Sequence, residues 1–184
     1  MKFSEYYLYL EQAASSIVIL PGGFKPPHKG HFEALKYLLK NSNTNNAIVF
    51  IGKKERDGIT QEQSLKIWNI YKKYIPANIE IVAVTGADKA GREATPLSMT
   101  YDFIEDNKNN YAGFFVGAGQ EDMNRFKGLE KDQQKYPNTK IIAIPPQFNR
   151  ISGTETRNKL KEGILDFIPQ EVKEKEEIKS ILKA

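Results

Sequence analysis

The chain has 184 residues, of which 40% are hydrophobic and 27% are charged, and its formal net charge is +4 at pH 7. This composition excludes a disordered chain and suits a single domain over residues 1–184, while the small charge gives no reason to expect a nucleic-acid partner. No apolar run approaches the ~20 residues that cross a bilayer, and the lack of cysteine excludes disulfides and thiolate metal sites, so we expect a cytoplasmic protein without a membrane partner.

Short apolar runs alternate with amphipathic stretches along the chain, which is typical of βαβ units around a parallel sheet. The expected strands, rich in β-branched or aromatic residues, are 16–20, 47–51, 79–84, 113–116 and 140–144. The expected helices are 3–14, 28–40, one that starts at Thr60 with a capping box, 97–106, 120–134, 153–162 and 169–183. We therefore predict an α/β fold, a Rossmann-like doubly wound five-stranded parallel sheet with helices on both faces. The first and last helices are expected to pack on this domain, the last with a mixed-charge, solvated face.

A segment rich in glycine, proline and histidine, GGFKPPHKGH at 22–31, directly follows the first expected strand. It holds the only two histidines of the chain, His28 and His31, which share one face at the expected start of a helix. A helix N-terminus attracts anions, and imidazoles there can donate hydrogen bonds to phosphoryl oxygens. Gly30 has no side chain, so a flat base or a phosphate can approach its backbone closely. The plainer alternatives are ordinary surface or core histidines, or a two-histidine metal site that lacks a third ligand at a useful spacing.

A second segment, RISGTETR at 150–157, follows the fifth expected strand. Ser152 and Thr154 are good N-cap residues for the helix after it, and Arg157 in the first turn can reach back to the same anion. Hydroxyls, backbone N–H groups and a guanidinium together suit the β- and γ-phosphates of a nucleotide. The plainer alternative is a simple helix cap followed by a solvated arginine.

Both segments resemble signatures of the cytidylyltransferase-like nucleotidyltransferase superfamily. The first is similar to G-x-F-x-P-x-H-x-G-H and matches at Gly22, Phe24, Pro26, His28, Gly30 and His31. The second is similar to I-S-S-T-x-x-R and matches at Ile151, Ser152, Thr154 and Arg157. The resemblance spans the chain topologically, and these two segments are its specific part.

Three positions depart from the superfamily's pattern. Gly23 stands where Thr or Ser is frequent, so phosphate contact there would come from the backbone alone. Lys25 stands where Asp or Gln is frequent, at a position that helps to shape the substrate side. Gly153 replaces the second serine of the second signature, and the resulting S-G-T-E form resembles the archaeal-type nicotinamide mononucleotide adenylyltransferases more than the cytidylyltransferases.

The resemblance implies transfer of a nucleoside monophosphate, AMP from ATP, to a phosphorylated small molecule such as nicotinamide mononucleotide, with release of pyrophosphate. It also implies Mg²⁺ that bridges the triphosphate without a dedicated protein cage. The implied catalytic residues are His28, His31 and Arg157. The implied nucleotide-binding residues are Gly22, Gly23, Phe24, Gly30, Gly117, Gly119, Asp122, Ser152 and Thr154.

Two other readings of the same motifs stay open. One is a cytidylyltransferase that uses CTP and an alcohol phosphate, and the other is a non-catalytic nucleotide-binding module on the same fold. The expected partners are therefore ATP or CTP and a phosphorylated acceptor. The sequence leaves open whether the chain forms a homo-oligomer.

The loops after the other strands carry weaker signals. In the segment VGAGQEDMNRF, the residues that correspond to a base- and ribose-contacting loop of the family are Gly117, Gly119 and Asp122, although a plain glycine-rich turn fits equally well. The candidates for substrate binding are Lys25, Lys53, Lys54, Arg56 and Arg92, against the plainer reading of solvated surface charges. The loop at 85–96 is long enough to act as a substrate lid. Trp68 is expected in the core.

Overall fold

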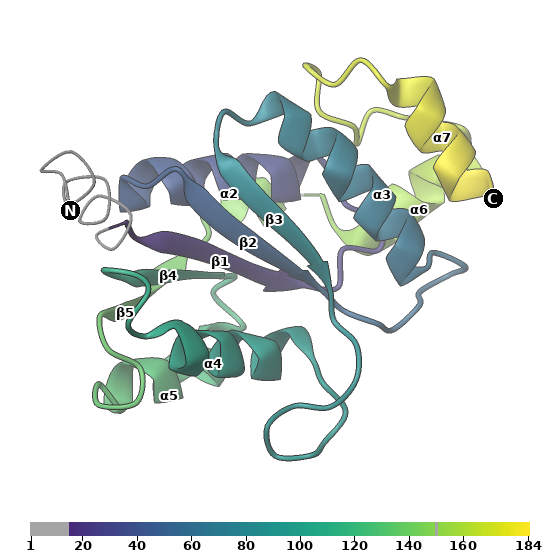
Figure 1. Cartoon of the computed structure of the whole chain (residues 1–184). Coiled ribbons are helices and arrows are strands. Elements are labelled where there is room, and N and C mark those ends of the chain that lie inside the picture. Colours follow the sequence, from purple (N-terminus) through teal and green to yellow (C-terminus); the bar gives the residue numbers. More distant parts are fainter. Residues whose placement is uncertain (1–14, 150) are drawn as a thin grey trace, which may run out of the picture.

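A computed structural model describes residues 15–149 and 151–184 of the chain (Figure 1). The expected helix at 3–14 lies outside the described residues. The strands are β1 Ile17–Gly22, β2 Asn46–Ile51, β3 Asn78–Ala83, β4 Phe114–Ala118 and β5 Thr139–Ala143. They form a five-stranded sheet in the order β3-β2-β1-β4-β5, and every neighbouring pair is parallel. The predicted Rossmann-like fold is therefore confirmed.

The helices begin and end close to where the sequence pattern places them, with two exceptions. They are α2 Lys29–Ser42, α3 Gln61–Tyr71, α4 Pro96–Asn107, α5 Met123–Lys131, α6 Gly153–Lys161 and α7 Lys175–Lys183, with 3₁₀ turns η1 Lys72–Tyr74 and η2 Pro146–Asn149. The capping box predicted at the start of α3 is confirmed, because Thr60 and Gln63 each accept the backbone N–H of the other. Across residues 15–149 and 151–184, no helix is both long and apolar enough to cross a membrane.

Helices cover both faces of the sheet because the strands are apolar on both sides. Along β1, Val18 and Leu20 enter the core cluster that contains α2 and α3, whereas Ile17 and Ile19 enter the cluster that contains α4 and α5. Figure 1 shows α2 and α3 on one side of the sheet and α4 and α5 on the other. The two clusters cover the two faces of the sheet but not the ends of its strands, where a site can form.

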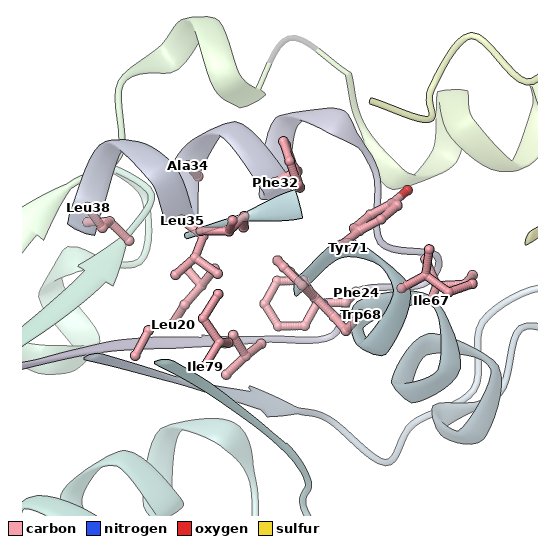
Figure 2. Packing of buried hydrophobic residues seen from close by; sticks show 14 of the residues in the cluster. Leu20, Phe24, Phe32, Ala34, Leu35, Leu38, Ile67, Trp68, Tyr71 and Ile79 are labelled. Carbon is pink, nitrogen blue, oxygen red and sulfur yellow. The ribbon is translucent and has the colours of Figure 1, made fainter. Parts of the chain in front are cut away.

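The first motif is anchored in the core through Phe24. Its ring meets the buried Trp68 ring edge-on, with the centroids 5.3 Å apart (Figure 2). A Cβ added at Gly22 would lie 2.6 Å from Phe24 Cζ, so the ring can lie beneath the end of β1 only because residue 22 is glycine. The prediction that Trp68 is a core residue is confirmed, and the packing fixes where the loop toward α2 begins.

The C-terminal region differs from the sequence-based expectation. The last helix starts at Lys175 rather than at residue 169, and its face is not simply solvated, because Ile178 is fully buried with Val172 in the core cluster beside α3. Gln63 Nε2 donates to the Ile181 carbonyl at 2.9 Å and joins α3 to α7. Helix α5 is also shorter than the predicted 120–134, since it spans only Met123–Lys131 and residues 133–138 form turns before β5.

The strand order reverses beside β1. The chain runs from β1 outward through β2 and β3, and then returns to β4 on the other side of β1. Connections that leave β1 and β4 in opposite directions open a crevice at the carboxyl ends of these strands, where open α/β sheets bind ligands. The first motif follows β1 directly and therefore enters this crevice.

Candidate active site

A cavity of about 580 Å³ occupies the crevice at the carboxyl ends of the strands. It is lined by predicted site residues from the loops after β1, β2 and β4, namely Gly22, Gly23, Phe24, His31, Lys53, Lys54, Arg56, Gly117, Gly119 and Asp122. A second cavity, of about 770 Å³, lies beside it between the loop that follows β3 and helices α4 and α5. Glu93, Thr95, Leu97 and Arg125 line both cavities, so the two are adjacent.

The histidine pair caps helix α2. His28 is the N-cap residue and its Nδ1 accepts the Gly30 N–H at 3.2 Å, while His31 Nδ1 accepts the His28 N–H at 3.2 Å. The two rings stack with their centroids 3.6 Å apart. Because each Nδ1 is an acceptor, this hydrogen-bond network assigns the ring proton of both neutral imidazoles to Nε2. His31 lines the cavity, whereas His28 is 2% exposed and is not among the residues that line it.

Burial keeps both imidazoles neutral. It lowers the pKa of His28 to about 4, an effect that Glu155 partly opposes, and it lowers the pKa of His31 well below its usual value, with His28 adding to the effect. At neutral pH the pair therefore presents hydrogen-bond donors rather than positive charges. An entering polyphosphate would itself favour the protonated forms, because an anion stabilises a nearby imidazolium.

Packing explains why residue 30 is glycine, and the sequence alone did not reveal this. A Cβ at this position would lie only 2.0 Å from the Phe148 carbonyl oxygen in η2. The expectation was that the bare backbone admits a base or a phosphate, but on this side the space is filled by the chain itself. The close approach brings η2, which leads into the second motif, against the start of α2.

Lys25, a predicted substrate-binding residue, is buried, and its ammonium is hydrogen-bonded within the protein itself. The residue is 4% exposed, and its Nζ donates to the carbonyls of Gly23 and Gly52, both at 2.8 Å. These carbonyls lie just beyond β1 and β2, so the ammonium ties the two loops together. Burial lowers the pKa of Lys25 to about 8, with the charge of Arg56 contributing.

The second motif meets the first, as predicted. Ser152 caps α6, since its hydroxyl accepts the Glu155 N–H at 3.0 Å. Thr154 is not a cap but lies in the first helical turn, where its hydroxyl accepts a hydrogen bond from Arg157 Nη2 at 3.2 Å. Arg157 Nη1 donates to the Lys25 carbonyl at 3.0 Å, which joins the two motifs directly.

Asp57 is a site residue that the sequence analysis missed. Its carboxylate forms an ion pair with Arg157 Nε, and the Arg157 side chain is only 11% exposed. The one local signal was the Asp57–Gly58 dipeptide, which is typical of a tight hairpin turn. Nothing in that dipeptide indicates which basic residue the aspartate will meet.

The remaining charged residues predicted at the site lie around the cavities, and Lys53, Arg92 and Asp122 form ion pairs there. Lys53 pairs with Glu93 at 3.4 Å, and Arg92 pairs with Asp88 at 2.9 Å. Arg92 lines the larger of the two cavities rather than the one that contains His31. Lys54 and Arg56 line the His31 cavity, whereas Asp122, at the start of α5, pairs with Arg125 at 2.9 Å.

The donors at the site suit phosphate oxygens rather than a metal ion. Backbone N–H groups, imidazoles, an ammonium and a guanidinium are all hydrogen-bond donors that complement anions. Within the described part of the chain, no group of three or more His, Cys, Asp or Glu side chains is arranged to hold a metal ion.

Comparisons with known proteins agree with the fold and the motifs. No family model matches the chain. A Fusobacterium nucleatum protein assigned as a nicotinate-nucleotide adenylyltransferase is 28% identical, over 85% of this chain and 94% of that protein. A crystal structure assigned as a nicotinate-nucleotide adenylyltransferase, from Vibrio parahaemolyticus, has a TM-score of 0.61 at 14% identity and covers 92% of this chain and 99% of its own. The Plasmodium falciparum nicotinic acid mononucleotide adenylyltransferase complexed with APC has a TM-score of 0.60 at 16% identity and covers 92% and 94%.

In its fold, its paired signatures and its curated relative, the chain is similar to the nucleotidyltransferases of the cytidylyltransferase-like superfamily, which supports its assignment as an enzyme of the nucleotidyltransferase type. The solved structures, at their low identities, support the fold in this assignment. Within the superfamily, the chain is similar to the nicotinate-nucleotide adenylyltransferases.

Proposed function

We propose that this enzyme transfers AMP from MgATP to a pyridine mononucleotide, with nicotinate mononucleotide as the first acceptor to test and nicotinamide mononucleotide as the second. The observation that carries the proposal is the contact between Arg157 and the Lys25 carbonyl, which places the guanidinium of the second motif beside the loop that leads to the histidine pair. Donors from both ends of the chain then surround one polyphosphate. The names of the relatives support adenylyl transfer to a pyridine mononucleotide.

The proposed reaction is an in-line displacement at the α-phosphorus. A phosphate oxygen of the acceptor attacks this atom, the bond to the bridging oxygen breaks, and pyrophosphate leaves. No covalent enzyme intermediate is needed, because positioning and charge stabilisation supply most of the catalysis in phosphoryl transfer. His31 Nε2–H would donate to the α-phosphate as negative charge develops there. Arg157, with the capped N-terminus of α6, would hold the departing pyrophosphate.

The two adjacent cavities offer room for two ligands. The one that His31 lines would take the nucleotide, and the larger one between α4 and α5 lies where an acceptor could meet it. Lys53, Lys54 and Arg56 at the mouth of the first cavity are the proposed contacts for the acceptor's phosphate. This assignment of the cavities follows from the position of His31 in the smaller one.

The experiment that tests the proposal is a matrix of nucleotides and acceptors. Pyrophosphate release is measured with ATP and CTP, each against nicotinate mononucleotide, nicotinamide mononucleotide, choline phosphate and an alcohol phosphate. We expect turnover with ATP and a pyridine mononucleotide. Turnover confined to CTP and an alcohol phosphate would replace the proposal with the cytidylyltransferase alternative. Tight nucleotide binding without turnover on any acceptor would favour a non-catalytic binding module.

A further inference from the structure

Between β2 and α3 the chain makes a two-residue hairpin whose tip is Asp57. Arg56 and Ile59 exchange backbone hydrogen bonds at 3.2 and 2.9 Å, and Asp57 and Gly58 both have positive φ, at 50° and 78°. Two consecutive positive φ values define a type I′ turn, for which Asp-Gly is a preferred sequence. Ile59 is 3% exposed and anchors the hairpin in the protein. The fold thus presents Asp57 from a defined turn.

The Asp57 carboxylate meets the guanidinium of Arg157, which has partners from three segments of the chain. Nε pairs with Asp57, Nη1 donates to the Lys25 carbonyl at 3.0 Å, and Nη2 donates to the Thr154 hydroxyl at 3.2 Å. A guanidinium has five N–H donors. These contacts use one donor on each nitrogen, so one N–H on each terminal nitrogen is left for a phosphate oxygen.

The same guanidinium explains why residue 153 is glycine. A Cβ there would lie 3.0 Å from Arg157 Nη1 and 3.6 Å from the Lys25 carbonyl oxygen. The serine that the superfamily signature has at this place would crowd the arginine in its present orientation. Two departures from the signatures, Lys25 and Gly153, therefore border the group that Asp57 binds.

We propose that Asp57 is a positioning residue that holds Arg157 in the orientation that binds the leaving pyrophosphate. The inference rests on the proposed function, because it takes Arg157 as the pyrophosphate ligand. The carboxylate binds Nε, so it does not occupy the N–H group that is left on each terminal nitrogen for phosphate. It also holds the long arginine side chain in one of its many rotamers before the ligand binds. A carboxylate that instead blocked the phosphate position would act as a latch, and its removal would tighten binding.

The test compares Asp57→Ala and Asp57→Asn with a matched control, Glu55→Ala, which removes a carboxylate from the same exposed loop. Binding of inorganic pyrophosphate and of MgATP is measured by calorimetry, and kcat and KM are measured for ATP. We expect Asp57→Ala to weaken pyrophosphate binding and to raise the KM for ATP by about 10-fold relative to Glu55→Ala, the size expected for one charge-assisted hydrogen bond. Asp57→Asn keeps an acceptor for Nε and should lie between Asp57→Ala and the parent. The melting temperatures of these variants should differ little, because the Asp57 side chain is 54% exposed to solvent.

A double variant separates positioning of Arg157 from any direct role. If Asp57 acts through the guanidinium, Asp57→Ala adds no further loss of pyrophosphate affinity in an Arg157→Ala background. The proposal is overturned if Asp57→Ala matches Glu55→Ala, if it tightens binding, or if its effect persists without Arg157. Should the wild-type protein adenylylate no acceptor, the proposed function fails, whereas the pyrophosphate measurements still decide the role of Asp57.

Discussion

His31 accepts the backbone N–H of His28 through Nδ1 at 3.2 Å, while the two imidazole rings stack 3.6 Å apart. The same ring thus closes the first turn of α2 and offers its Nε2–H to a ligand. These two tasks use different ring nitrogens, so different substitutions can remove them separately. Asparagine resembles the Nδ1 side of histidine, and glutamine resembles the Nε2 side.

We expect His31→Asn to lower kcat by ~10²-fold or more, because it removes the Nε2–H donor that would stabilise charge at the α-phosphate. Its melting temperature should stay near that of the parent, since an acceptor for the His28 N–H remains. His31→Gln should show the reverse, with more residual turnover and a weaker helix cap. Wild-type kcat in the asparagine variant would remove His31 from the chemistry.

The pKa of His28 predicts how stability depends on pH. Its pKa is lowered to about 4 in the folded protein by burial, whereas the usual value is 6.5, so the unfolded chain binds more protons between these values. The free energy of unfolding should therefore fall as pH drops from 7 toward 4, on the order of 2 kcal/mol from His28 alone at pH 5. Thermal unfolding from pH 4 to 8 measures the slope. His28→Asn keeps a capping acceptor without this titration and should flatten the slope, and an unchanged slope in that variant would contradict the assignment.

Gly30→Ala should destabilise the protein, because its methyl group would lie 2.0 Å from a backbone carbonyl, that of Phe148. Backbone must then move, and overpacking of this kind costs about 1–3 kcal/mol. Gly23→Ala is the matched control for stability, since a Cβ at Gly23 meets nothing within 4 Å. Chemical denaturation of both variants provides the measurement. Equal midpoints would show that η2 does not lie against Gly30 in solution.

Gly23→Ser should lower the KM for ATP by about 5-fold, the size expected for one added hydrogen bond. The reason is that Gly23 lines the cavity, has open space at its Cβ position, and stands where the superfamily often has a hydroxyl residue. The effect should appear with ATP and not with the acceptor. A rise in the KM for ATP would show that the triphosphate passes too close to this backbone for a side chain.

The sequence predicted the fold and the location of the site for identifiable reasons. Strands buried on both faces give apolar runs, and a motif directly after the first run must lie at its carboxyl end. The Thr60 and Gln63 capping box is a local pattern, and it fixed the start of α3 within one residue. The second motif follows the last strand in the same way, so the convergence of the two motifs could be predicted as well.

Contacts between distant segments could not be predicted from local patterns. Asp57 and Arg157 are 100 residues apart, and Lys25 Nζ reaches a carbonyl 27 residues away. Lys25 was interpreted as a substrate ligand because it stands at the position of the signature that helps to shape the substrate side. The helix predicted at 120–134 was too long at both ends, because α5 spans Met123–Lys131 and is followed by turns at 133–138.

The link from Arg157 to the Lys25 carbonyl spans 132 residues of chain. During synthesis on the ribosome, a chain that has completed β1 through β5 still lacks the arginine and helix end that would grip a triphosphate. If both motifs hold the nucleotide as proposed, the sheet assembles on its own apolar contacts before the complete site exists. A nucleotide held by both motifs would then stabilise the protein only once residue 157 has been synthesised.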